Sequence, residues 1–224
     1  MKGRRTASLL LITAGLALFG IAARHYFLGW QAQRDGRAAF EASQATRVDH
    51  RLENPGLALA SSRAGGTSAP SAAAATPGGL PEGYPYGEPI ARLRIPAAEI
   101  DAIVFGGADQ KILEKGPGHV PGTELPGRST DIRNCVITGH RDSHFRHLGW
   151  LRPGSEVALQ AEHATRRYRV VSREIVTPDT IRVLQPTATA RLTLITCYPF
   201  NYVGPAPKRL VVVAEPAEGT VGTR

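Results

Sequence analysis

Aromatic residues and cysteines are scarce in this chain of 224 residues. Phe, Trp and Tyr make up 6% of it and there are two cysteines, whereas Gly and Pro number 24 and 17. This balance favours many short strands joined by turns over a helical bundle. No internal repeat is present, and no segment after residue 84 keeps a long 3.6-residue period, which argues against a doubly wound α/β fold.

The chain is basic, with a formal net charge of +8 and a pI near 10. Its basic residues are scattered, with little aromatic interleaving and no RNA-binding or helix-turn-helix signature. We therefore predict that nucleic acid is not a partner. An electropositive enzyme beside an anionic envelope surface fits the charge as well.

An uncharged run covers residues 6–23, and its 18 residues are just long enough to cross a hydrocarbon core of about 30 Å. Aromatic residues follow where an interfacial belt would lie, at Tyr26, Phe27 and Trp30. Basic residues flank the run, at Lys2, Arg4, Arg5 and Arg24. The basic N-terminal flank predicts a cytoplasmic tail at residues 1–5, a single-pass anchor at 6–23 and export of the rest.

A cleaved signal peptide is the alternative, because Gly20 and Ala22 are small enough for a processing site. The length of the apolar run and the aromatic cluster behind it favour a retained anchor. The juxtamembrane segment, residues 24–55, is polar and rich in Arg and Ala, and we leave open whether it continues the helix or is disordered.

Residues 56–83 consist almost wholly of small residues with Gly and Pro, which cannot bury enough apolar surface to fold. We expect this linker to act as a tether that lets the domain at residues 84–216 reach a few tens of ångströms from the membrane, at about 5–6 Å times the square root of its length. Residues 217–224 are expected to be a disordered tail.

Short apolar segments separated by turn residues begin after Tyr84, and seven of them are predicted to be strands. They cover residues 90–95, 102–105, 135–138, 156–159, 168–175, 192–196 and 210–214. Short helical turns are expected at 110–115 and 144–151. Seven or eight strands predict a mainly β fold closed into a barrel.

Cys197 ends the apolar, β-branched strand of the run LTLITCYP at residues 192–199. A thiol at a strand end faces the edge of the sheet, where a substrate can reach it. His140 follows the predicted strand CVIT through a glycine, so it also projects from a strand end. A base and a thiol at two strand ends can form a Cys-His couple.

Arg209 begins the last predicted strand, and an isolated Arg there would be a solvated charge. Beside a thiol nucleophile, its fixed donors can stabilise the oxyanion of a tetrahedral intermediate, an effect worth about 3–4 kcal/mol. Strand alternation places the neighbouring Lys208 on the other face.

A disulfide between Cys135 and Cys197 is the structural alternative. Five extended residues span about 16 Å, so Cys135 and His140 cannot both lie near Cys197. We therefore expect Cys135 to be a buried small hydrophobe.

The helical spacing of His140, His144 and His147 suits a metal ion. The sequence has no H-E-x-x-H signature, and an Arg-rich setting repels a dication, so we predict no metal and no cofactor. His119 is expected to hold a turn in its loop.

Four motifs together resemble the sortase family, most closely the class D sortases and their Gram-negative relatives. They are GHVPGT at residues 118–123, ITGHRDSHFRHL at 137–148, LRPGSEV at 151–157 and LTLITCYPFNYVGPAPKRLVV at 192–212. The resemblance covers residues 88–214 and implies an eight-stranded sortase β-barrel, with residues 84–216 as the catalytic domain.

The resemblance implies Cys197 as the nucleophile that forms an acyl-thioester, His140 as the acid and base, and Arg209 as the oxyanion or carbonyl donor. Thr196 is expected to line the substrate groove. The implied reaction cleaves an LPxTG-like sorting signal on a substrate protein and transfers the acyl group to an amine acceptor, outside the cytoplasmic membrane.

Two other functions compete with this interpretation. An L,D-transpeptidase would need a Ser-x-Gly-Cys-Arg-type segment, where this chain has Ile-Thr-Cys-Tyr. A non-catalytic, membrane-tethered peptide-binding barrel would not need all three groups.

Overall fold

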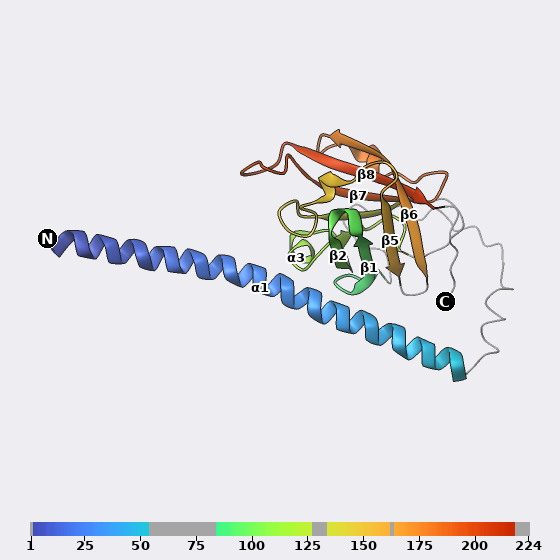
Figure 1. Ribbon diagram of the computed structural model, residues 1–224, viewed down its shortest axis with the longest axis horizontal. Coiled ribbons are helices and arrows are strands. Elements are labelled where there is room, and N and C mark those ends of the chain that lie inside the picture. The colour runs from blue at the N-terminus through green and yellow to red at the C-terminus, as the bar shows by residue number, and fades with distance from the viewer. Residues whose placement is uncertain (1, 54–83, 127–133, 162–163, 218–224) are drawn as a thin grey trace.

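The computed structural model describes residues 2–53, 84–126, 134–161 and 164–217, which form one long helix and a closed eight-stranded β-barrel (Figure 1). Around the barrel the strand order is β1-β2-β3-β4-β7-β8-β6-β5. The predicted mainly β barrel is therefore confirmed. The elements are α1 (Lys2–Glu53), β1 (Pro89–Ile95), β2 (Ile100–Gly106), β3 (Gly118–His119), β4 (Asn134–Gly139), β5 (Glu156–Ala161), β6 (Thr165–Val176), β7 (Arg191–Tyr198) and β8 (Lys208–Pro216).

Short helical segments occupy the connections between strands. They are η1 (Pro96–Ala98), α3 (Gln110–Leu113), η2 (Leu148–Trp150) and η3 (Ile181–Leu184). The predicted turns at 110–115 and 144–151 correspond to α3 and η2. Asp109 starts α3, because its side chain accepts a hydrogen bond of 3.0 Å from the backbone N–H of Lys111.

Strand β3 was not predicted, because its two residues are too few to show an alternating pattern. It pairs in parallel with β2 and antiparallel with β4, and so joins the two halves of the barrel. His119 lies in β3, fully buried, and burial lowers its pKa. Its Nε2 donates to the carbonyl of Glu124 (2.8 Å) and its Nδ1 accepts from Tyr84 (2.8 Å), so it holds the turn as expected.

Residues alternate between the barrel interior and its outer face along each strand. On β7, Leu192 and Leu194 belong to the main core, and on β8 the core members are Leu210, Val212 and Ala214. The alternating residues face outward: Thr193, Ile195 and Cys197 on β7, and Arg209, Val211 and Val213 on β8. This alternation decides which side chains can meet outside the barrel.

Helix α1 extends beyond the apolar N-terminal run and packs along the barrel, so the juxtamembrane segment is helical up to Glu53 (Figure 1). Gln33 hydrogen-bonds both the N–H and the carbonyl of Ile103, at 2.7 and 3.0 Å. Phe40, 3% exposed, packs with Ile103, Phe105 and Ile112 in a second apolar cluster.

The contacts of α1 with β1 and β2 hold the helix against the barrel independently of the predicted linker. Residues 56–83 and 218–224 lie outside the described residues. By length and composition alone, the stretch Ile12–Ala45 of α1 contains a window of 18 residues apolar enough to span a membrane.

Replacing Phe40 with Ala should release the helix from the barrel. Burying a Phe side chain is worth about 1.5–3 kcal/mol, so amide exchange in residues 29–44 should accelerate about tenfold or more in the variant. Phe27→Ala is the control, because Phe27 is 59% exposed. Equal exchange in the two variants would show that Phe40 does not hold the helix.

Candidate functional site

Cys197 ends β7 directly opposite Arg209, the second residue of β8. Residues that face each other across an antiparallel pair project on the same side of the sheet, with Cα atoms about 4.5–5.5 Å apart. Both lie at outward positions. Lys208 pairs with Tyr198, one residue further along the two strands, and therefore belongs to the opposite face of the sheet from Cys197 and Arg209.

The parallel pairing of β4 with β7 brings His140 to the same place. Gly139 pairs with Thr196, so the following residue, His140, lies level with Cys197 on a neighbouring strand about 4.8 Å away. Across this pair too, a residue that faces outward on β4 lies beside a residue that faces outward on β7. His140, Cys197 and Arg209 thus form a row across β4, β7 and β8 on the outer face, and all three are half-buried.

Cys135 lies on the opposite face of the same sheet. It pairs with Leu192, five residues before Cys197, and its side chain is buried in the core. Burial raises the pKa of its thiol, and both cysteines are free. The disulfide alternative is therefore ruled out in this fold, and Cys135 is the buried small side chain that was expected.

The turn that carries His140 is fixed by two residues whose part in it the sequence did not reveal. The hydroxyl of Thr196 donates a 2.7 Å hydrogen bond to the carbonyl of Gly139. The ring of Phe145, fully buried, covers Gly139 so closely that a Cβ there would lie 2.9 Å from it. Thr196 is 1% exposed, so its side chain offers almost no surface to a groove and instead acts through Gly139.

Arg141 joins this turn to the loop between β7 and β8. Its guanidinium donates to the carbonyls of Pro199 (3.0 Å), Tyr202 (2.6 Å) and Gly204 (3.0 Å). Its charge also lies over the ring of Tyr202, 5.9 Å from the centroid. Because that loop separates Cys197 from Arg209, Arg141 fixes the surroundings of both.

The guanidinium of Arg209 is held by its own loop. Its Nη1 donates to the carbonyls of Ala206 (3.1 Å) and Lys208 (3.0 Å). Within the described part of the chain these bonds use Nη1 alone, so Nε and Nη2 remain available as donors. No hydrogen bond between described residues joins Cys197, His140 and Arg209, and such bonds commonly tighten only when substrate is bound.

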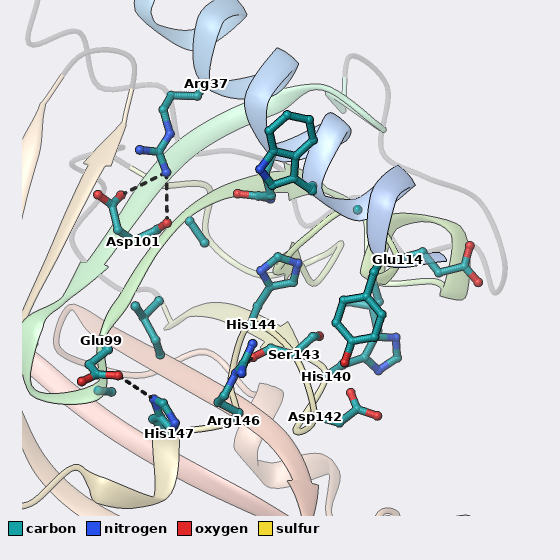
Figure 2. A pocket seen from close by; sticks show the side chains of 18 residues that line it. Arg37, Glu99, Asp101, Glu114, His140, Asp142, Ser143, His144, Arg146 and His147 are labelled. Atoms are coloured by element: carbon teal, nitrogen blue, oxygen red, sulfur yellow. Dashed lines mark hydrogen bonds and ion pairs between the residues drawn. The ribbon is translucent and has the colours of Figure 1, made fainter. Parts of the chain in front are cut away.

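A cavity of about 580 Å³ lies beside the row, between α1 and the loop that follows His140 (Figure 2). Tyr26 and Trp30 of α1 form one wall, and His140 and His144 the other. Burial lowers the pKa of His144, and electrostatic interaction with His140 and Arg146 lowers it further. Of the three residues in the row, His140 lines this cavity, and Cys197 and Arg209 do not.

The three histidines of this loop have separate surroundings. His147 lies 3.3 Å from the carboxylate of Glu99 and stacks on Trp150 with ring centroids 3.8 Å apart. Among the residues with described positions, no three His, Cys, Asp or Glu side chains gather in a way that could hold a metal ion.

A model of the sortase domain matches residues 93–217. The chain belongs to the sortase family. Sortase D of Bacillus subtilis (strain 168) is 36% identical over 121 residues, covering 54% of this chain and 60% of that protein. Sortase A of Staphylococcus aureus (strain NCTC 8325 / PS 47) is 32% identical over 131 residues, covering 54% and 62%.

Solved sortase structures share the barrel. Sortase C-1 from Actinomyces oris superposes with a TM-score of 0.54 at 29% identity, over 58% of this chain and 75% of that one. The Clostridium perfringens Sortase D5 transpeptidase gives a TM-score of 0.53 at 23% identity, over 59% and 81%, and supports the fold alone. The predicted class D resemblance is confirmed, while the chain spans about 60% of the length of the curated relatives it matches.

Thr196→Val should loosen the turn that carries His140. Loss of the hydroxyl leaves the Gly139 carbonyl without this donor, at a cost of about 1–3 kcal/mol. Thr193→Val is a matched control, because Thr193 is also buried on β7 and donates to Asn134 (2.6 Å) at the far end of the strand. Both variants should lose stability in urea, but faster amide exchange at residues 139–145 is expected in Thr196→Val alone. Equal exchange would remove Thr196 from this role.

Proposed function

We propose that this protein is a cysteine transpeptidase that cleaves a C-terminal LPxTG-like sorting signal and transfers the new acyl end to an amine. The proposal rests on one observation, the row of His140, Cys197 and Arg209 on the outer face of the barrel. Each group stands at a strand end, half-buried, where a peptide can reach it. The family supports the same chemistry, since sortases are cysteine transpeptidases.

In the first half-reaction the sulfur of Cys197, as thiolate, attacks the scissile carbonyl carbon of the substrate. The carbonyl oxygen becomes an oxyanion, which accepts hydrogen bonds from the free donors of Arg209. When the intermediate collapses, the C–N bond breaks and His140 gives its proton to the departing amine. The acyl group remains on Cys197 as a thioester.

In the second half-reaction an acceptor amine attacks the thioester carbon. His140, now neutral, takes a proton from this amine, and the thiolate of Cys197 leaves as the new amide forms. The positions of Thr196 and Phe145 support this double role, because both fix the turn from which His140 projects.

The proposed site of action is the outer surface of the cytoplasmic membrane. Residues 1–5 would remain in the cytoplasm, residues 6–23 would span the bilayer, and residues 84–216 would form the catalytic domain outside. The apolar stretch of α1 supports this single-pass topology. The partners are then a substrate protein that carries the sorting motif, an amine acceptor of the envelope, and the membrane itself.

Cys197→Ala should abolish both peptide cleavage and thioester capture, because no other described thiol lies on the outer face. Cys135→Ala should keep most of the activity, since Cys135 is a core residue. Intact-mass analysis after incubation with a peptide-like electrophile measures capture directly. Equal loss in both variants would contradict this assignment, and failure of the wild type to label would favour the non-catalytic peptide-binding barrel.

Arg209→Lys should lose much of the turnover although it keeps the charge, because a lysine lacks the planar fork of donors. Arg209→Ala should lose about 100- to 1000-fold, the usual cost of one oxyanion donor. Lys208→Ala is the matched control, and initial rates on one peptide should stay near wild type. Normal turnover in both Arg209 variants would remove this residue from the site.

A further inference from the structure

The contacts of α1 run in a fixed order along the barrel, and this order orients the domain. Gly29 lies against the carbonyl of Glu114, so closely that a Cβ there would come within 2.9 Å. Fifteen residues later, Gln44 donates to the carbonyl of Ala161, at 3.3 Å. His140 lines one cavity with Glu114 and with Tyr26 and Trp30 of α1. The end of the barrel that carries His140 therefore lies toward the N-terminal, apolar part of α1, and the end of β5 lies away from it.

The short helical distance from the proposed membrane span places the His140 end of the barrel close to the bilayer surface. From Ala23, the last residue of the proposed span, to Gly29 there are six residues, or about 9 Å at 1.5 Å per residue. The headgroup layer is about 5–8 Å thick on each side of the hydrocarbon core. Tyr26 and Trp30, which line the cavity beside His140, fall at the level where aromatic side chains anchor a helix.

The loop between β7 and β8 projects from the same end of the barrel. In Figure 1 it extends beyond the other loops toward the N-terminal half of α1. Its tip is apolar and exposed, with Val203 at 96% and Tyr202 at 46% exposure. Arg141 holds the loop in this position through three carbonyls. An apolar tip with cations close by, Arg141 and the exposed Lys208, suits an anionic lipid surface.

We propose that the barrel rests on the bilayer that its own helix spans, with the tip at Tyr202 and Val203 among the lipid headgroups. The row of His140, Cys197 and Arg209 then opens at the membrane surface. This proposal rests on the proposed membrane span and deepens the proposed function, because it restricts the substrate to sorting signals held at the same bilayer. The docked helix sets this geometry.

Nitroxide labels on the full-length chain in lipid nanodiscs test the orientation. Val203→Cys and Val171→Cys are each made in the Cys197→Ala background, where Cys135 is too buried to label. Val171, 42% exposed on β6, is a matched control, because its neighbour Val170 pairs with Ala214 at the barrel end away from His140. The nanodiscs contain phosphatidylglycerol and phosphatidylethanolamine, and the probes are oxygen, which enters lipid, and a water-soluble nickel chelate.

The ratio of oxygen to nickel collisions should be at least threefold higher at position 203 than at position 171. Equal ratios would overturn the proposal, and so would a label at position 203 that neither probe reaches, because that result indicates a protein partner or a second copy on the tip. Peptide cleavage by the unsubstituted chain in the same nanodiscs is measured in parallel. If the unsubstituted chain does not cleave the peptide but the ratio of oxygen to nickel collisions at position 203 is high, the proposed function is contradicted and the proposed orientation is still supported.

Discussion

The parallel pairing of β4 with β7 is the interaction on which the site depends. Gly139 opposite Thr196 places His140 level with Cys197, and the antiparallel pairing of β8 adds Arg209 to the same row. A shift of one residue in either register would turn one of these side chains to the other face. Apolar side chains inside the barrel resist such a shift, because Leu192, Leu194 and Val212 would leave the core.

The same end of the barrel joins the candidate site to α1. His140 contributes to the cavity against α1, and Arg141, next in sequence, fixes the loop whose tip is exposed. The segment after β4 therefore combines three features. It carries His140, holds the loop between Cys197 and Arg209 through Arg141, and lines the cavity against α1.

The sequence was informative where a residue's place follows from local pattern. Cys197 and Arg209 terminate apolar runs, so their strand ends and outward positions could be predicted, and the seven predicted segments all became strands. The docking of α1 could not be predicted, because Gln33 and Phe40 meet β2 only through contacts 63–70 residues away in sequence. The positioning roles of Arg141 and Thr196 were hidden for the same reason, since each acts on a segment about 57–63 residues away.

The most direct test of the central claim is a disulfide formed across the row. In the variant His140→Cys, mild oxidation followed by non-reducing peptide mass mapping should join the new thiol at position 140 to Cys197, because the two positions lie side by side on neighbouring strands. Cys135 should stay free. A disulfide that includes Cys135, or no link between positions 140 and 197, would contradict the register and with it the proposed site.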